Sequence, residues 1–289
     1  MTPRRALHRG AEAESPFRNC CRIFAWYRGL FSREKGQRYK QFHLDTRKLG
    51  TMNYFTYSVA PEIFARFPGY VRGVVLAHEV RNGPSPSELV QLLREAEKSV
   101  RDRLTLDQIA EEPRIKSWRE AYRSFGARPS DFRCSVEAMA RRALRGDELP
   151  TVNALVDIGN VISLKYLVPA GGHAIDVLNG DIELRLATGD EQFVAFGSDE
   201  LEHPLPGEVV FVEGNTVLTR RWTWRQANHT LTLPDTTAIE FNVDGLPPVT
   251  RGEIEMACAE LADLVRRFCG GKVRIDYLTA ETPRISLAP

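Results

Sequence analysis

The pattern of apolar and polar positions becomes regular at residue 52 and from there predicts short strands alternating with helices. Apolar or alternating runs at 54–59 and 70–76 predict two strands. Ser85, Pro86, Ser87 and Glu88 then form a capping-box pattern, with proline at the first helical position, which predicts a helix from there to about residue 104. The chain therefore begins its folded part as a mixed α/β structure.

Three further segments have helical patterns. Residues 109–125 are expected to be a broken helix that stops before Gly126, and residues 135–145 a helix that stops before Gly146. Thr250 and Glu253 form a second capping box. It opens a helix that places apolar side chains on one face before glycines end it at 270–271.

The middle of the chain is predicted to be largely β-structure. Residues 152–164 are apolar enough to be mostly buried, yet polar residues interrupt them, and those need internal partners or a ligand. Strand-like runs follow, separated by Gly, Pro, Asp and Asn, at 182–186, 208–212, 216–219 and 238–243. The predicted fold class is α+β.

Charge divides the chain at the same place as the apolar pattern. Residues 1–51 contain 12 Lys and Arg against 4 Asp and Glu, whereas residues 52–289 contain 27 against 34. We interpret 1–51 as a basic, disordered extension and 52–289 as a single domain. The extension is either an arm that contacts phosphates or, as we favour, a segment upstream of a true start at Met52.

Composition argues against several classes of protein. No apolar run is long enough to span a membrane, and no secretory signal is evident, so we expect a cytoplasmic protein without a membrane partner. The five cysteines are scattered without zinc-ligand spacing, and the six histidines form no ligand pair. We therefore expect no metal and no cofactor.

A series of short motifs between residues 118 and 246 occurs in one order. Its members are REAYR at 119–123, RPS at 128–130, SVEA at 135–138, VDIGN at 156–160, SLKY at 163–166, GDI at 180–182, RLA at 185–187 and RWTWRQ at 221–226. Together they resemble the B3/B4 module of the bacterial phenylalanyl-tRNA synthetase β subunit, and more closely the freestanding proteins built on it. The resemblance spans about half of the chain.

The resemblance implies a fold and an activity. The fold would combine mixed helices with a largely antiparallel β-sandwich or barrel-like body. In the synthetase this module hydrolyses the ester of tyrosine wrongly attached to tRNA, so the implied partner is aminoacylated tRNA and the implied activity is an aminoacyl-tRNA hydrolase. Such an ester is already activated, so a site that orients water and stabilises the oxyanion needs no protein nucleophile.

The resemblance also indicates site residues. Asn160 falls on a pocket asparagine of the family, and Gly159 replaces the threonine before it. Gly171 stands where the synthetase has a histidine, with Gly172 and His173 after it, and Asn242 stands where it has the glutamate that recognises tyrosine. These departures weaken the case for tyrosine as substrate. The catalytic candidates are Asn160, Gly171, Gly172 and His173, the last as the nearby side chain that titrates around neutral pH.

The remaining pocket candidates are Asp157, Gly159, Trp224, Arg225, Gln226 and Asn242. Each has a structural alternative, since Asp157 and Asn160 could satisfy backbone groups and His173 could be a loop residue. Trp222 and Trp224 would lie on one face of a strand, where core packing is the commoner use. Arg225 and Gln226 would bind a carboxylate, a phosphate or the terminal adenosine, or pair on the surface.

A basic segment at 114–145 supplies the candidate RNA contacts. It holds nine Lys and Arg against three acidic residues within an acidic body. A solvated face is the alternative interpretation, but the local excess favours RNA binding. The candidates are Arg119, Arg123, Arg128, Arg141, Arg142 and Arg145.

Two functions from different classes stay open at this point. One is a trans-editing aminoacyl-tRNA deacylase, and the other is a non-catalytic module that binds tRNA or an amino acid. The amino acid, the tRNA and the oligomeric state are not determined by the sequence.

The charge reversal at Met52 generates the first prediction. A chain that starts at Met52 is expected to fold and to keep the activity of the full chain, because the apolar pattern begins there. Thermal melting and activity of the two chains measure this. A large loss of either in the shorter chain would contradict the prediction.

Overall fold

The computed structural model describes residues 54–289, and the prediction for residues 1–51 lies outside the described residues. The helices are α2 (Pro61–Arg66), α3 (Ser87–Arg103), α4 (Pro113–Ser124), α5 (Ser135–Leu144), α6 (Ala154–Tyr166) and α7 (Arg251–Phe268). The strands are β1 (Thr56–Val59), β2 (Val71–His78), β3 (Ala170–Ala174), β4 (Ile182–Leu186), β5 (Phe193–Val194), β6 (Leu201–Glu202), β7 (Val209–Glu213), β8 (Thr216–Arg220), β9 (Arg225–Gln226), β10 (Ala238–Gly245), β11 (Lys272–Leu278) and β12 (Arg284–Ser286). The predicted α+β class is confirmed.

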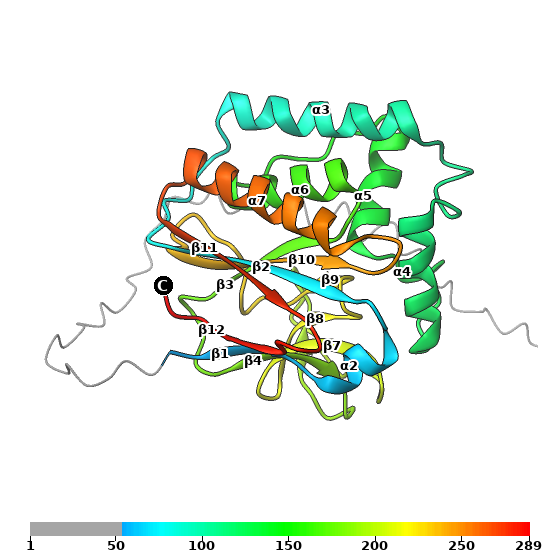
Figure 1. Cartoon of the computed structure of the whole chain (residues 1–289), viewed down its shortest axis with the longest axis vertical. Coiled ribbons are helices and arrows are strands. Elements are labelled where there is room, and N and C mark those ends of the chain that lie inside the picture. The colour runs from blue at the N-terminus through cyan, green and yellow to red at the C-terminus, as the bar shows by residue number, and fades with distance from the viewer. Residues whose placement is uncertain (1–53) are drawn as a thin grey trace, which may run out of the picture. The chain divides into compact units, whose positions relative to one another are not determined.

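Two larger sheets face each other, and helices cover one of them (Figure 1). The first has the order β12-β1-β4-β7-β8-β9, and the second has the order β11-β2-β10-β3. Their ladders are antiparallel apart from the parallel pair β1 and β4. Within residues 54–289 no sheet closes into a barrel, so the sandwich-like arrangement is correct and the barrel-like alternative is not.

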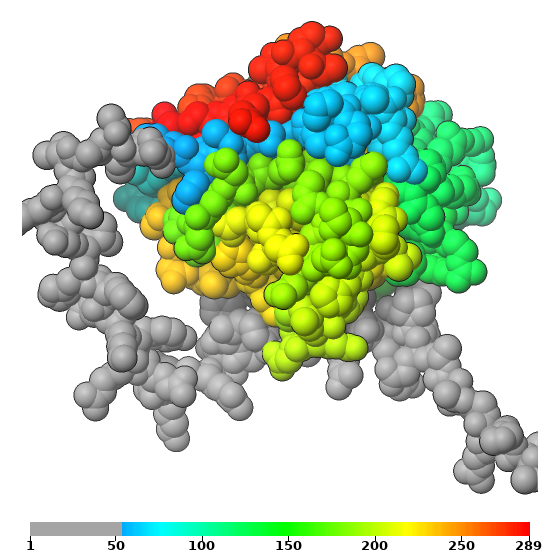
Figure 2. Space-filling view, turned by 90° about the horizontal axis from the view of Figure 1, so that it is seen from below, coloured from blue at the N-terminus to red at the C-terminus, as the bar shows by residue number. Residues whose placement is uncertain are grey.

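Helices α6 and α7 pack on the second sheet, and α3 lies over them (Figure 1). Glycine makes this close approach possible. A Cβ on Gly73 of β2 would stand 2.2 Å from the Sγ of Cys258 in α7, and one on Gly245 of β10 would stand 2.7 Å from Ile254. The other face of the molecule, seen in Figure 2, is formed largely by the segments of the first sheet and their loops.

A buried polar network joins the two sheets. Arg72 of β2 donates from Nε and Nη2 to the two carboxylate oxygens of Asp244 in β10, at 2.7 and 3.0 Å. The Tyr70 hydroxyl donates to the same carboxylate at 2.5 Å, and Arg72 Nη1 donates to Tyr57 of β1 at 2.5 Å. The Arg72 guanidinium also lies over the Phe211 ring of β7, 5.4 Å from its centre. These contacts satisfy both charges of the buried pair.

Of the two capping boxes that the sequence predicts, one forms and the other does not. The Thr250 and Glu253 capping box forms as predicted at the start of α7. Ser85 instead donates its hydroxyl to Asp157 at 2.6 Å, so α3 begins at Ser87 without a side-chain cap. The helix expected from residue 109 begins only at Pro113, because Glu112 accepts from the N–H of Ile115 and caps it there.

Several strands were not predicted. β3 has the sequence AGGHA, which is poor in β-forming residues, and it is a strand because β10 pairs with it along its length. β11 and β12 were also missed. β11 pairs with β2, and β12 pairs with β1. In both cases a strand close to the C-terminus pairs with one that lies much earlier in the sequence.

The network between the sheets generates the second prediction. Asp244→Asn removes the charge that balances a fully buried arginine, and breaking such a pair costs about 3–5 kcal/mol. We expect a loss of that size in the free energy of unfolding, measured with urea. Asp263→Asn is the matched control, because its ion pair with Arg266 is exposed and worth about 0–1 kcal/mol. Equal losses in the two variants would show that the buried pair is not critical.

Candidate functional site

The candidate site lies at the outer edge of β3, which pairs with β10 on one side only. The register directs the backbone groups of Ala170, Gly172 and Ala174 away from β10. The N–H groups of Ala170 and Ala174 bond to Ser163 Oγ at 3.0 Å and to the Thr230 carbonyl at 3.1 Å. The Gly172 carbonyl accepts from Gln226 Nε2 at 3.2 Å. Within the described residues, the N–H of Gly172 has no acceptor, so it is a free donor.

Gly171 is exposed, and it pairs with Asn242 across the ladder. A Cβ at Gly171 would lie 3.7 Å from the Asn242 side-chain oxygen, so the two residues face the same side of the sheet. Asn242 is buried and donates from Nδ2 to Glu240 Oε1 at 3.2 Å. The predicted residues Gly171, Gly172, Gln226 and Asn242 are therefore brought together by β3.

Glu240 lies beside the candidate site, and the sequence analysis did not identify it. It is fully buried opposite His173, and burial raises the pKa of its carboxyl to about 8. Its Oε2 is buried without a hydrogen-bond partner in the described part of the chain. A buried carboxyl oxygen without a partner is rare and costly. Its position within the apolar strand 238–243 was the signal that could have identified it.

Asn160 lies on α6, the helix packed against β3. The preceding Gly159 allows the close approach, since its Cβ would lie 3.5 Å from the Ala170 carbonyl and 3.8 Å from the Phe241 ring. Asn160 is half-buried, and its side-chain amide has no partner among residues 54–289. A half-buried amide without a partner is available to a ligand or a water molecule.

His173 differs from the sequence expectation. Its ring is buried, with Nδ1 2.9 Å from the Thr230 hydroxyl and Nε2 3.1 Å from the Thr219 hydroxyl. Burial and then the charge of Arg72 lower the pKa of His173 to about 3. The imidazole is therefore neutral at physiological pH, and the expectation that it titrates near neutrality was wrong.

Asp157 holds the loops at the start of α6. It accepts hydrogen bonds from Ser85 Oγ at 2.6 Å and from the N–H of Val152 at 3.1 Å. Burial raises its pKa to about 6. Both partners belong to loops that precede helices. These contacts agree with the alternative interpretation, in which Asp157 forms structural hydrogen bonds and does not bind a ligand.

Residues 221–224 form a turn, so the expectation that Trp222 and Trp224 share one strand face was wrong. Arg221 and Trp222 have φ of 47° and 63°, the left-handed region that bulky residues rarely adopt. Trp222 is consequently buried against Trp118, whereas Trp224 is half-buried and packs against Phe132.

The arginines of this turn and of the neighbouring strands have different partners. Arg221 stacks on Phe132 at 3.6 Å, and Arg220 forms ion pairs with Glu202 and Glu208. The guanidinium of Arg225 lies over the Trp224 ring at 4.9 Å. In the part of the chain that the structure describes, Arg225 has no acidic partner, although it adjoins Gln226 at the edge of β3.

Some arginines of the predicted patch pair with groups inside the protein, and others face solvent. Arg119 of α4 and Arg141 of α5 each lie 2.8 Å from Oε1 of the fully buried Glu137, so Arg119 joins α4 to α5 and Arg141 forms a pair within α5. Arg142 donates to the Glu148 carbonyl at 2.9 Å, and Arg145 lies 3.7 Å from Asp147.

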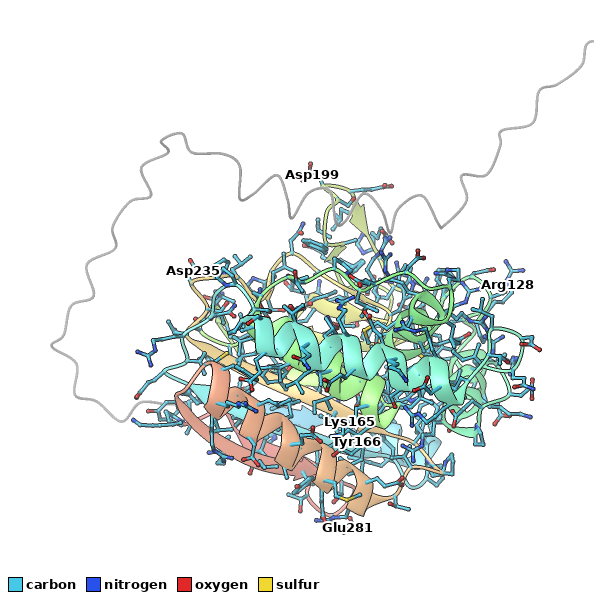
Figure 3. All side chains as sticks on the ribbon, turned by 90° about the horizontal axis from the view of Figure 1, so that it is seen from above. Arg128, Lys165, Tyr166, Asp199, Asp235 and Glu281 are labelled. Atoms are coloured by element: carbon cyan, nitrogen blue, oxygen red, sulfur yellow. The ribbon has the colours of Figure 1, made fainter. Side chains whose placement is uncertain are left out.

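Arg123, Arg128 and Arg145 of the patch are exposed. Arg128 is 82% exposed beside Asp131 and points outward in Figure 3. Arg123 is exposed and has no acidic partner among the described residues. These two are the arginines of the predicted patch that are best placed to meet a polyanion.

Metal-binding clusters and membrane-spanning helices are both absent from residues 54–289. No group of three or more His, Cys, Asp or Glu side chains is placed to hold a metal ion. None of the helices there has the length and apolar character needed to cross a membrane. Cys134, Cys258 and Cys269 are buried free thiols.

Comparison with known proteins places the chain in a family. A search of curated proteins found no match. A solved N-terminal fragment of the phenylalanyl-tRNA synthetase β subunit from Pyrococcus horikoshii is similar, with a TM-score of 0.42 and 13% identity over 86% of this chain. The match spans 55% of that fragment. The B3/4 domain family matches residues 117–270, just over half of the chain, and the chain belongs to that family.

Proposed function

We propose that this B3/4 domain protein hydrolyses the ester of a mischarged aminoacyl-tRNA at the outer edge of β3. The observation that carries the proposal is the free N–H of Gly172. This donor lies on the strand against which the helix of Asn160 packs, and Asn160 has an unpartnered amide. The motif series and the family membership support tRNA as the partner.

The backbone geometry suits an ester carbonyl. The Gly172 N–H would donate to the carbonyl oxygen, and that bond strengthens as the oxygen becomes an oxyanion. Gln226 holds the strand edge in place through the Gly172 and Thr230 carbonyls, at 3.2 and 3.0 Å. Because Gly171 is exposed and lacks a side chain, the backbone can be approached closely.

The Asn160 amide would orient the attacking water and donate to the developing oxyanion. The water oxygen bonds to the carbonyl carbon, the bond to the ribose oxygen breaks, and the water proton passes through solvent to that leaving oxygen. No protein nucleophile or metal is required, because the aminoacyl ester is activated. His173 takes no part as a base, since its imidazole is buried and both ring nitrogens have partners.

Cations near the site would hold the RNA. Arg225 adjoins Gln226 and has no acidic partner in the described residues, so it suits a phosphate near the acylated end. Arg123 and Arg128 would contact phosphates farther along the tRNA.

A second candidate function is a non-catalytic module that binds aminoacylated tRNA without cleaving it. The surroundings of His173 favour it, because burial makes the imidazole a weak base with a pKa of about 3 and both ring nitrogens already have partners. Amino acid release from a panel of mischarged tRNAs separates the two functions.

The third prediction concerns Asn160→Asp. The change keeps the volume but places an anion beside the developing negative charge, so single-turnover deacylation should fall by roughly 10²–10³. Affinity for tRNA should change little, because distant phosphates supply it. Asn215→Asp, on the turn between β7 and β8, is the matched control. Full activity of a folded Asn160→Asp protein would remove this residue from the mechanism.

The fourth prediction concerns the exposed arginines. Arg123→Glu with Arg128→Glu should weaken tRNA binding and reduce the slope of log affinity against log salt by about 0.7–0.9 per lost contact. Arg119 is unsuitable for this test because it stabilises the buried Glu137.

Arg251→Glu with Arg266→Glu, on α7, makes the same change in net charge and serves as the control. Titrations at several salt concentrations give the slopes. The same slope in both double variants and in the parent chain would assign Arg123 and Arg128 to solvent.

A further inference from the structure

Asn242 carries a hydrogen-bonding group that the hydrolysis steps described above do not use. Its side chain is only 7% exposed, and its Nδ2 donates to Glu240 Oε1 at 3.2 Å. This bond orients the amide, because the carboxyl oxygen takes the nitrogen and leaves Oδ1 on the other side. Within the described residues, Asn242 Oδ1 accepts no hydrogen bond. The buried Asn242 therefore presents a free acceptor whose orientation Glu240 fixes.

The free oxygen faces an open position beside Gly171. Gly171 is exposed and pairs with Asn242 across the ladder of β3 and β10. Apart from the chain next to Gly171 itself, a Cβ at this residue would have one heavy atom within 4 Å, which is Asn242 Oδ1 at 3.7 Å. The space beside this oxygen is thus open, and there is room for a small donor group.

This position is within reach of an ester bound to the N–H of Gly172. Covalent geometry places the Gly172 nitrogen no more than about 8 Å from Asn242 Oδ1. An aminoacyl ester has its α-amino nitrogen about 3 Å from its carbonyl oxygen, so with a hydrogen bond of about 2.9 Å at each end it spans up to about 9 Å. One aminoacyl group can therefore bond to Gly172 and Asn242 at the same time.

Asn160 and Asn242 approach the aminoacyl group from opposite sides of β3. Asn242 lies on the face of the second sheet that is turned toward the first sheet, whereas α6, which carries Asn160, packs on the other face. A water molecule held by Asn160 and a group held by Asn242 consequently occupy different places.

The chemistry of the open position selects a hydrogen-bond donor. An amide oxygen accepts hydrogen bonds and donates none, so a carboxylate or a phosphate gains nothing from it. An ammonium group donates to it in a charge-assisted bond, which is stronger than a bond from a neutral donor. Every aminoacyl ester carries such a donor, the α-amino group, on the carbon next to its carbonyl.

We propose that Asn242 binds the α-amino group of the aminoacyl ester, so that the substrates are esters with a free α-amino group. This inference rests on the proposed ester site and names the class of substrate that the site takes. An N-acylated aminoacyl-tRNA is a poor substrate, because acylation removes the charge and adds bulk at the open position.

Three non-hydrolysable probes test the inference without requiring catalysis. They are 3′-amino-3′-deoxyadenosine acylated on its 3′-nitrogen with an alanyl, a lactyl or a propionyl group, and they differ only in the amino group, hydroxyl or hydrogen on the α-carbon. Calorimetric titration of the full chain should show the alanyl probe binding at least about tenfold tighter than the propionyl probe, with the lactyl probe between them. Equal affinities of the alanyl and propionyl probes, or no binding of the alanyl probe, would overturn the proposal.

Hydrolysis is measured separately, so that the two proposals can fail independently. Preference for the alanyl probe without hydrolysis of any aminoacyl-tRNA would refute the deacylase and support the amino subsite. Hydrolysis without that preference would support the deacylase and refute the subsite.

Gly171→Ala locates the subsite. The added methyl group lies 3.7 Å from Asn242 Oδ1, an ordinary contact distance, so the variant is expected to fold with the open position filled. Its preference for the alanyl over the propionyl probe should fall to about twofold or less. Gly180→Ala is the matched control, because its methyl group also meets its neighbours at ordinary distances, 3.7 and 3.8 Å from Glu213, and it should keep the full preference.

Asn242→Leu provides an independent check. It keeps the approximate size of the side chain but removes the acceptor, so the alanyl probe should bind only as tightly as the propionyl probe. A side chain with a purely structural role would instead weaken both probes equally. Full alanyl preference in both Gly171→Ala and Asn242→Leu would show that the amino group binds elsewhere and would overturn the assignment.

Discussion

The buried pair of Arg72 and Asp244 is the constraint on which the two-sheet arrangement depends. A charge in the core is tolerated only when partners satisfy it, and here the partners come from different elements. Arg72 and Asp244 join β2 to β10, and the hydroxyl of Tyr57 brings in β1 of the other sheet. A slip of one residue in β10 would turn Asp244 toward the helices and leave Arg72 uncompensated. The pair therefore specifies both the register of β10 and the face that meets the first sheet.

The register of β10 in turn arranges the candidate ester site. Alternation along β10 places Glu240, Asn242 and Asp244 on the face toward the first sheet, while Phe241 faces α6. The same register decides which backbone groups of β3 face outward, and these include the free N–H of Gly172. The catalytic donor proposed here is thus a consequence of strand pairing, whereas the titratable groups nearby are buried and serve the packing between the sheets.

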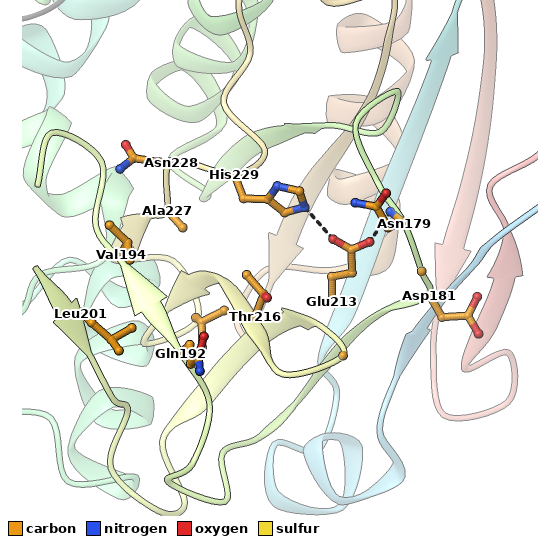
Figure 4. Close-up of a pocket in the computed structure, with 13 residues that line it drawn as sticks. Asn179, Asp181, Gln192, Val194, Leu201, Glu213, Thr216, Ala227, Asn228 and His229 are labelled. Carbon is orange, nitrogen blue, oxygen red and sulfur yellow. Dashed lines mark hydrogen bonds and ion pairs between the residues drawn. The ribbon is translucent and has the colours of Figure 1, made fainter. Parts of the chain in front are cut away.

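Charge is used differently in three parts of the molecule. Glu137 of α5 pairs with Arg119 of α4 and with Arg141 of its own helix, whereas Arg123 and Arg128 are exposed. The turn at 221–224 buries Arg221 between aromatic rings and presents Arg225 next to the strand edge. A pocket on the first sheet is lined by the carboxylates of Asp181 and Glu213, and His229 pairs with Glu213 there (Figure 4). A polyanion would accordingly be attracted to the exposed arginines and not to this pocket.

The sequence by itself determined the features that depend on local patterns. It predicted the strand at 182–186, the capped helix after Thr250 and the α+β class, and its motif order indicated the family. It also named Asn160, Gly171, Gly172 and Gln226 as candidate site residues, although not the hydrogen bond from Gln226 to the Gly172 carbonyl. Only the tertiary structure decided that AGGHA is a strand, that Ser85 bonds to Asp157 instead of capping a helix, and that His173 is neutral. Only the tertiary structure placed Glu240 in the core and His229 beside Glu213. Local pattern reports how a residue suits its neighbours in the chain, but hydrogen-bond partners, burial and pKa depend on groups that are distant in sequence and meet only when the chain folds.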